Sequence, residues 1–357
     1  MKERIYVCHT YYHVYVTFLK ELNMPIEKRG QATLVLSRMS TDFESFASRA
    51  KASGLFEDVI EYDEKPASYF EVLAPLKENR GNIVLNMISR ILFCRKFAKL
   101  QEPFVPVDFR EYRDVYVYCD SDPIGYYLNY NKIYYHALED GLNCIAYYDT
   151  ARFDNRGAFK FKAFLSKYLN LIFIQNGYGR YCKEMEVNDI SKIKHPCPYY
   201  KEVPRQAYVE ALTEEDKNII LKAFVKDYDT LAEALKRADA AGKKKVLILT
   251  EPLCDLETRE RIFRDIIKMY GQDAVVVLKP HPRDVLDYNT LFSDYLRIDR
   301  TVPMEMLNFI PNVHFELLIS VLTETAAIQF ASEKIKLGPD FMDAYEEAHI
   351  HRQNEQI

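Results

Sequence analysis

Residues 274–284 read AVVVLKPHPRD, and this stretch points to the class of fold. Its first half is a run of apolar, mostly β-branched residues, which is typical of a buried strand. Its second half places a proline on each side of His281, and proline fixes the backbone and does not continue a sheet. We therefore expect a strand at Ala274–Lys279 that ends in a rigid turn carrying His281.

Similar apolar runs alternate with helical patterns along the chain, which predicts an α/β fold with parallel sheets and crossover helices. The expected strands are Ile5–Cys8, Ala32–Leu36, Asp58–Tyr62, Val115–Cys119, Lys132–His136, Leu171–Ile174, Val246–Thr250, Ala274–Lys279, Tyr295–Ile298, Phe315–Ser320 and Lys334–Leu337. The expected helices are Ser45–Ser53, Ile83–Lys99, Thr213–Ala241, Leu256–Tyr270, Met304–Phe309 and Glu324–Ala331. No internal repeat and no low-complexity segment interrupts this alternation.

A break in the pattern near the middle of the chain predicts two domains. The segment His195–Arg205 is rich in Pro and Tyr, as linkers often are. A length of 357 residues suits two domains of about 150–200 residues each. We expect two Rossmann-like domains, residues 1–200 and 201–357, facing across a cleft. Ligands of such sheets bind beyond the carboxyl ends of the strands.

Composition excludes several classes of protein. The net charge is −5 and no long basic block is present, so nucleic acid is not an expected partner. The seven cysteines are scattered without zinc-site spacing, which predicts reduced thiols and a cytoplasmic location. The apolar runs are too short to be a signal peptide or a membrane span. Any membrane association is therefore expected to be peripheral, at the inner face; the oligomeric state stays open.

The turn after Ala274–Lys279 is the first candidate site. His281 is held between two prolines, and Lys279 and Arg283 flank it. One imidazole among cationic side chains suits a diphosphate or phosphodiester leaving group. A solvent-facing turn is the alternative reading.

The second candidate is Glu139-Asp140-Gly141, which follows the expected strand Lys132–His136. Adjacent carboxylates raise the pKa of at least one of the two groups, which suits a general base. We expect Gly141 to close a tight turn that exposes one carboxylate. An ordinary acidic loop is the alternative reading.

Three further segments at strand or helix ends belong to the candidate nucleotide site. Ser320, Thr323 and Thr325 lie where a strand meets an expected helix start, and Thr323 as N-cap would add an anion site. Pro303-Met304-Glu305 places a carboxylate suited to ribose hydroxyls near a helix start, and Thr250-Glu251 follows another strand.

Other catalytic signatures are absent from the sequence. It has no phosphate-binding P-loop, no dinucleotide fingerprint after a strand and no nucleophile elbow. Asp120-Ser121-Asp122 is similar to the DxD motif that binds metal in some enzymes, but it lies in the first domain, away from the His281 turn. We therefore expect no metal at the site.

As a set, these segments resemble the bacterial sialyltransferases of glycosyltransferase family 52 and related sialyltransferases and polysialyltransferases. Those enzymes carry D/E-D/E-G, His-Pro and Ser-Ser/Thr motifs in that order. Glu139-Asp140-Gly141 is similar to the first motif, and Lys279-x-His281-Pro282 is similar to the second. The third motif departs, because Thr323-Glu324 stands where a Ser-Ser or Ser-Thr pair is usual.

Two shorter segments add to the resemblance. Pro303-x-Glu305 is similar to a Pro-x-Glu that contacts the nucleotide ribose. Cys8-His9-Thr10-Tyr11-Tyr12-His13 is similar to the first strand and the acceptor-facing loop of the family.

The resemblance implies a GT-B fold and an inverting transfer of sialic acid from CMP-sialic acid, without metal or other cofactor. The acceptor would be a galactoside or a sialylated glycan, as in capsule or lipooligosaccharide synthesis. The implied base is Asp140, or alternatively Glu139, and His281 would assist departure of CMP. The implied substrate-binding residues are His9, Thr10, Tyr11, Thr250, Glu251, Lys279, Pro282, Glu305, Ser320, Thr323 and Thr325.

Two other functions fit the same residues. One is a transferase that uses a CDP-polyol or a UDP-sugar, because the His281 turn would serve those phosphates equally well. The other is a catalytically silent nucleotide-sugar binding protein, which the departure at Thr323-Glu324 keeps open.

Overall fold

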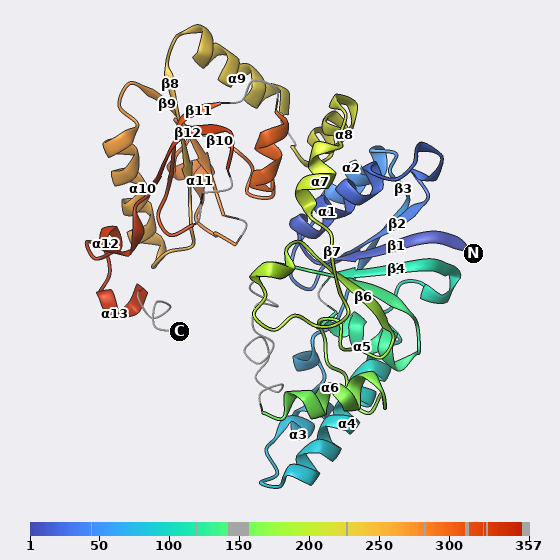
Figure 1. The fold of residues 1–357 in the computed structure, drawn as a ribbon. Helices are drawn as coiled ribbons and strands as arrows, with labels where there is room; N and C mark the ends of the chain where they lie inside the picture. The colour runs from blue at the N-terminus through green and yellow to red at the C-terminus, as the bar shows by residue number, and fades with distance from the viewer. Residues whose placement is uncertain are drawn as a thin grey trace. The chain divides into compact units, whose positions relative to one another are not determined.

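The chain folds into two compact units, Met1–Asp216 and Lys217–Ile357, each built around its own sheet (Figure 1). The structure is a computed structural model, and it describes residues 1–43, 45–118, 120–141, 157–225, 228–281, 283–310, 314–323, 325 and 328–351.

The first unit holds a seven-stranded sheet of order β3-β2-β1-β4-β5-β6-β7, and every pair of neighbours is parallel. Its strands are β1 (Lys2–Cys8), β2 (Ala32–Ser37), β3 (Phe56–Tyr62), β4 (Tyr112–Tyr118), β5 (Tyr135–Leu138), β6 (Cys182–Val187) and β7 (Tyr200–Glu202). Its α-helices are α1 (Tyr11–Leu22), α2 (Phe46–Ala52), α3 (Ala74–Lys77), α4 (Ile83–Gln101), α5 (Pro123–Tyr130), α6 (Phe159–Lys167) and α7 (Arg205–Glu210). Short 3-10 turns are η1 (Ile26–Lys28), η2 (Ala67–Tyr69), η3 (Glu71–Leu73), η4 (Phe109–Glu111) and η7 (Ile190–Lys192).

The second unit holds a five-stranded parallel sheet of order β10-β9-β8-β11-β12. Its strands are β8 (Lys244–Leu249), β9 (Ala274–Lys279), β10 (Leu296–Arg297), β11 (Phe315–Ser320) and β12 (Ala331–Lys336). The helices of this part of the chain are α8 (Glu214–Phe224), α9 (Tyr228–Ala240), α10 (Leu256–Tyr270), α11 (Tyr288–Leu291), η8 (Met304–Phe309), α12 (Gly338–Met342) and α13 (Ala348–His351). The predicted α/β class, with two Rossmann-like sheets, is confirmed.

The boundary between the units lies after Asp216, later than the predicted division at residues 200 and 201. The reason is that the intervening chain bonds to the first unit. β7 pairs with β6, α7 packs against α1, and Arg29 donates to Asp216 over 2.7 Å. The Pro-rich stretch His195–Arg205 is thus part of the first unit rather than a linker.

Two predicted elements are wrong. The apolar stretch Leu171–Ile174 is not a strand, because its side chains fill a small cluster beneath α4 and α6 with Cys94 and Leu165. The helix expected over Glu324–Ala331 is contradicted as well, since its described residues are non-helical. The Phe315 backbone N–H donates to the Phe330 carbonyl over 2.9 Å, which leads the chain directly into β12.

Strand and helix faces pack into separate cores. In the first unit, Val7, Val117 and Ala137 contribute to a cluster that spans β1, β4 and β5. In the second, Ile262, Phe263 and other residues of α10 pack on β8, β9 and β11. Figure 1 shows α3, α4 and α6 gathered at one end of the first unit. Within the described residues, no helix combines the length and apolarity needed to cross a bilayer.

A buried ion pair fixes α1 against the sheet. Arg4 of β1 donates two hydrogen bonds, of 2.8 and 2.9 Å, to the two carboxylate oxygens of Glu21 on α1. The Tyr6 hydroxyl donates to the same carboxylate over 2.7 Å. Bidentate bonding of this kind holds two elements in one orientation. These bonds therefore fix the last turn of α1 against β1.

Candidate functional site

The carboxyl ends of β1, β4 and β5 carry a cluster of histidines and carboxylates. His9 follows β1, Asp122 follows β4, and Glu139 and Asp140 follow β5 directly. These strands are neighbours in a parallel sheet, so their carboxyl ends meet at one edge. The expected position of the acidic pair at a strand end is therefore correct. The strand itself ends at Leu138 rather than His136.

Asp140 is paired with His13, a residue of the first turn of α1 that the sequence did not single out. The side chain of His13 is fully buried, and its Nε2 bonds to the Asp140 carboxylate. Its Nδ1 accepts a hydrogen bond from the His9 backbone N–H over 3.0 Å, so the neutral ring carries its proton on Nε2. The ring stacks on Tyr118 with centroids 4.4 Å apart.

His13 stays neutral at physiological pH. Burial lowers the pKa of His13 to about 4, although the Asp140 carboxylate acts in the opposite direction. A neutral imidazole that donates to one oxygen of Asp140 orients that carboxylate without neutralising it. The Asp140 side chain keeps 32% of its surface exposed, enough for a ligand to reach it.

Glu139 has a different environment from its neighbour. Its side chain is only 3% exposed, and its carboxylate accepts hydrogen bonds from Arg205 over 3.1 Å and from the Asn188 backbone N–H over 2.7 Å. Arg205 also donates to the Glu139 carbonyl over 2.8 Å. The Glu139 carboxylate therefore binds α7 to the edge of the sheet. Gly141 does not have a left-handed backbone, and the chain that follows it lies outside the described residues, so the expected glycine turn remains a prediction.

His9 lies in a buried acidic pocket beside the pair. Its Nε2 is 2.7 Å from Glu64 and 3.6 Å from Asp122. Glu64 also accepts from the Ser37 hydroxyl and the Ile124 backbone N–H. Burial by itself lowers the pKa of His9, but the Glu64 and Asp122 carboxylates outweigh burial and raise it. The His9 Nδ1 is buried, with no hydrogen-bond partner among the described residues.

The neighbours of His9 in sequence play local roles in the first unit. The Thr10 hydroxyl caps α1 by accepting from the His13 backbone N–H over 3.2 Å. Tyr11 is buried against Phe43 and Phe46, with ring centroids 5.1 and 5.4 Å apart. The acceptor contacts expected of His9, Thr10 and Tyr11 remain predictions.

Asp120 and Asp122 do not form an evident metal site. Asp120 is 1% exposed, and its carboxylate accepts from the Tyr135 hydroxyl over 3.0 Å and the Asn176 backbone N–H over 2.7 Å. A Cβ on Gly125 would lie 1.8 Å from the Asp120 carbonyl, so α5 begins in a close turn there. Across the part of the chain that the structure describes, no group of His, Cys, Asp and Glu is arranged to hold a metal ion.

In the second unit, the turn after β9 presents His281 in one tautomer. Its Nδ1 accepts from the Arg283 backbone N–H over 3.1 Å, so the neutral ring carries its proton on Nε2. The His281 backbone N–H donates to the Thr250 hydroxyl over 3.3 Å, which ties the turn to β8. Burial, together with the charges of Arg283 and Lys279, lowers the pKa of His281. Pro282 lies outside the described residues.

Buried charges hold this turn in place. The Lys279 ammonium donates to the carbonyls of Pro280 and Arg300, over 2.9 and 3.2 Å. Asp284 accepts from Arg259 of α10 over 2.6 Å and from the Tyr288 hydroxyl over 2.8 Å. The turn is therefore bonded both to α10 and to the chain that follows it. Contact of Lys279 with a phosphate remains a prediction.

The loop after β11 differs from the prediction. Glu251 is buried, and its carboxylate accepts hydrogen bonds of 3.0 Å from the backbone N–H groups of Val321, Leu322 and Thr323. Thr323 is therefore not the N-cap of a helix, and these amides already bind an internal carboxylate. The Ser320 hydroxyl donates to the Thr323 carbonyl over 2.8 Å, which closes the turn.

The remaining nucleotide-site candidates are only partly described. Thr325 is buried just beyond the turn, whereas Glu324 lies outside the described residues. Glu305 lies in η8, a 3-10 helix over the predicted range Met304–Phe309, and its side chain is not described. Its contact with ribose therefore remains a prediction.

Three comparisons relate this chain to known proteins. The model of glycosyltransferase family 52 matches residues 77–338. An uncharacterized protein of Haemophilus influenzae is 30% identical over 128 residues, which is 34% of this chain and 39% of that protein. The chain thus spans well under half the length of the curated relative it matches.

Two bacterial sialyltransferases are among the solved structures that this chain resembles. The GT-B domain of a sialyltransferase from Photobacterium damselae has a TM-score of 0.50 at 11% identity, covering 90% of this chain and 86% of that one. An α/β-galactoside α-2,3-sialyltransferase from Photobacterium phosphoreum has a TM-score of 0.49 at 13% identity, covering 89% and 85%.

The two parallel sheets, with candidate groups at their carboxyl ends, define an α/β protein of the GT-B class. Because the family model matches more than half of its length, the chain belongs to glycosyltransferase family 52. The resemblance noted from its Glu139-Asp140-Gly141 and His281-Pro282 motifs is confirmed.

Proposed function

We propose that this chain is a sialyltransferase that moves sialic acid from CMP-sialic acid to a hydroxyl of a galactoside or sialylated glycan, with inversion and without a metal. The observation that carries the proposal is the pairing of Asp140 with His13. Family membership supports glycosyl transfer, and the sialyltransferases of similar fold support the choice of donor.

Asp140 is the proposed base. One of its oxygens is held by the Nε2–H of His13, and the other is proposed to accept the proton of the acceptor hydroxyl. Glu139 is the less suitable base, because its carboxylate is buried and is bonded to Arg205 and Asn188. A base needs a reachable lone pair, and exposure therefore favours Asp140.

The proposed reaction is a single displacement. The acceptor oxygen forms a bond to the anomeric carbon of the sialic acid while the bond from that carbon to the phosphate oxygen breaks. The electron pair stays on CMP, and the acceptor proton passes to Asp140. His281, whose Nδ1 is occupied by Arg283, would donate its Nε2–H to the phosphate as charge grows there. Such a contact contributes about 3 kcal/mol to the lowering of a barrier.

The nucleotide contacts are proposed for the second unit. Thr250 and Lys279 build the His281 turn, and Glu251 shapes the loop that carries Ser320 and Thr323. The amides of that loop already bind Glu251, so Thr323 is proposed to contact the donor through its hydroxyl rather than through a helix terminus.

The test is release of CMP from CMP-sialic acid by the purified protein, with lactose and sialyllactose as acceptors, with and without EDTA. We expect release that depends on the acceptor and is unchanged by EDTA. CDP-polyol and UDP-sugar donors are assayed in parallel. Turnover with one of those donors alone would replace the proposed donor. Loss of CMP release in EDTA, restored by a divalent cation, would contradict metal independence.

A further inference from the structure

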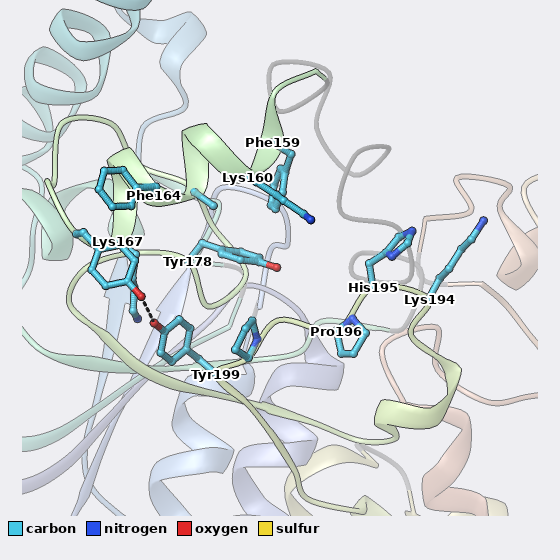
Figure 2. Close-up of a pocket in the computed structure, with 12 residues that line it drawn as sticks. Phe159, Lys160, Phe164, Lys167, Tyr178, Lys194, His195, Pro196 and Tyr199 are labelled. Atoms are coloured by element: carbon cyan, nitrogen blue, oxygen red, sulfur yellow. Dashed lines mark hydrogen bonds between the residues drawn. The ribbon is translucent and has the colours of Figure 1, made fainter.

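A pocket of about 490 Å³ lies on the first unit, away from the residues assigned above. It is walled by α6, by Tyr178 and by the segment 194–199 that precedes β7 (Figure 2). None of His9, His13, Glu139 or Asp140 lines it. A volume of several hundred Å³ is in the range of small-ligand sites.

The walls of the pocket are aromatic rings that contact one another. Phe159 and Tyr178 meet edge to face with centroids 5.1 Å apart, and Phe164 lies 5.3 Å from Tyr168. The hydroxyls of Tyr168 and Tyr199 are 3.4 Å apart, as the dashed line in Figure 2 marks. This bond and burial raise the pKa of Tyr199 to about 12, so its hydroxyl remains protonated. Rings with polar edges suit the flat apolar faces and the hydroxyls of sugars.

Lys167 shapes the interior of the pocket. Its ammonium donates to the carbonyls of Gly179 and Cys182, over 3.1 and 2.8 Å, and lies 3.8 Å from the centroid of the Tyr199 ring. Burial lowers the pKa of Lys167. This lysine binds the chain around it, so ligand recognition must come from other side chains.

The remaining charged positions are basic. Lys160, Lys194 and His195 line the pocket, and no Asp or Glu is among the described residues that line it. That composition differs from the whole chain, which carries 53 acidic against 48 basic residues. Figure 2 shows Lys160 and the Tyr178 hydroxyl directed toward the side of the pocket formed by His195 and Pro196. The charge of the pocket therefore complements an anion.

We propose that this pocket binds an acidic saccharide, one whose sugar ring stacks on the aromatic walls while its carboxylate or phosphate contacts Lys160. The inference rests on the proposed function to the extent that such a saccharide would be part of the glycan acceptor. It adds a second carbohydrate contact on the unit that carries Asp140, outside the reacting centre.

The test compares binding of sialyllactose, a phosphorylated hexose and lactose to the full chain by calorimetry. We expect Lys160→Ala to weaken binding of the acidic saccharide about tenfold, as loss of one charged contact does, and to leave lactose unchanged. Lys162→Ala is the matched control: it removes the same charge from α6 at a residue that does not line the pocket. Ala163→Trp fills the pocket and should weaken the acidic saccharide even with Lys160 present.

The two acidic probes separate a carboxylate from a phosphate as the preferred group. Equal affinity of the wild type for sialyllactose, the phosphorylated hexose and lactose would overturn the proposal. So would equal losses in Lys160→Ala and Lys162→Ala, or a Lys160-dependent affinity for anionic phospholipid vesicles without one for saccharides.

Failure of the pocket proposal can be told apart from failure of the proposed catalysis. CMP release from CMP-sialic acid, with lactose as acceptor, is measured on the same variants for this purpose. Pocket-dependent binding without any CMP release would refute the sialyltransferase and keep the pocket. If CMP release from CMP-sialic acid with lactose as acceptor is unchanged in Lys160→Ala, and the wild type shows no preference for acidic saccharides, the pocket proposal fails and the sialyltransferase proposal stands. Asp140→Asn, which leaves the pocket intact, should keep the affinity for sialyllactose.

Discussion

The candidate catalytic groups at the carboxyl ends of the two sheets are held in place by different kinds of hydrogen bond. In the first unit, Asp140 and His13 are bonded to each other, and His13 is fully buried. In the second, His281 is only half-buried and bonds through Nδ1 to its own turn, which leaves its proton on Nε2. The first unit thus orients a carboxylate through a partner side chain, whereas the second orients an imidazole through a backbone N–H group.

The largest expected effect tests the role of the oriented carboxylate. Asp140→Asn should lower kcat at least about 10²-fold with little change in thermal stability, because it removes the base but keeps the shape. Glu139→Gln should keep kcat within about tenfold, since its carboxylate has a structural role. Initial rates of CMP release and a melting curve measure both. A deeper loss of kcat in Glu139→Gln would move the base back by one residue.

Removal of the His281 imidazole in the second unit should lower kcat by a similar factor. His281→Ala should lower kcat about 10²-fold, because the leaving phosphate loses a hydrogen-bond donor. His314→Ala is the control in the same unit, since that exposed histidine bonds to Ser332 in β12. Single-turnover rates with CMP-sialic acid measure the loss. Equal rates in the two variants would remove His281 from the chemistry.

The next effect concerns stability rather than rate. Arg205→Ala leaves the buried carboxylate of Glu139 without its ion-pair partner, and breaking such a pair costs about 3 kcal/mol. Urea unfolding monitored by far-UV circular dichroism measures the free energy of unfolding. Arg113→Ala removes an exposed ion pair with Glu3 and should cost far less, because water screens that pair. Equal costs would mean that Glu139 is not held as described.

The pH dependence of stability tests the neutral state of His13. Its pKa is depressed to about 4 in the folded protein, below about 6.5 in an unfolded chain. The unfolded state therefore binds more protons between these values, so His13 makes the protein less stable as pH falls from about 6.5 toward 4. Between pH 7 and 5 this contribution is about 2 kcal/mol.

His13→Gln should reduce that loss relative to the wild type. His9, whose pKa is raised, contributes in the opposite direction in both proteins and cancels in the difference. Unfolding free energies at pH 7 and 5 give the comparison. Identical losses in the two proteins would mean that His13 is not buried as a neutral group.

The smallest expected effect concerns the loop after β11. Glu251→Gln keeps an oxygen for the backbone N–H groups of Val321, Leu322 and Thr323 but removes its charge. Hydrogen bonds to a neutral acceptor are weaker by about 1 kcal/mol. Urea unfolding measures this change. If Glu251→Gln lowered the free energy of unfolding by much more than Arg205→Ala does, the loop would contribute more to stability than its hydrogen bonds explain.

Secondary structure is predicted most accurately where the residue pattern of a segment is by itself enough to specify a strand or a helix. β9, β11 and α10 occur over the predicted ranges, because each carries a long apolar or amphipathic pattern. β6 was missed because its sequence, CKEMEV, alternates with charged residues, and Leu171–Ile174 was taken for a strand although its apolar side chains fill a loop.

For the candidate site too, only the features that a local sequence pattern determines could be predicted. The position of Glu139 and Asp140 at a strand end follows from local pattern, but the difference between them does not. That difference depends on Arg205 and His13, which lie far away in the chain and reach the two carboxylates only through the fold. The local signals for His13 were its place in the segment Cys8–His13 that resembles the acceptor-facing loop and its position three residues after the Thr10 cap.

The carboxylate of Glu251 among the amides after β11 has a thermodynamic consequence. Fixing the backbone of a residue costs about 1–2 kcal/mol in conformational entropy. Here the cost is offset during folding, because the Glu251 carboxylate accepts hydrogen bonds from the backbone N–H groups of Val321, Leu322 and Thr323. A ligand that arrives at this loop finds it already ordered. The free energy of its binding therefore carries no entropy cost for ordering these residues.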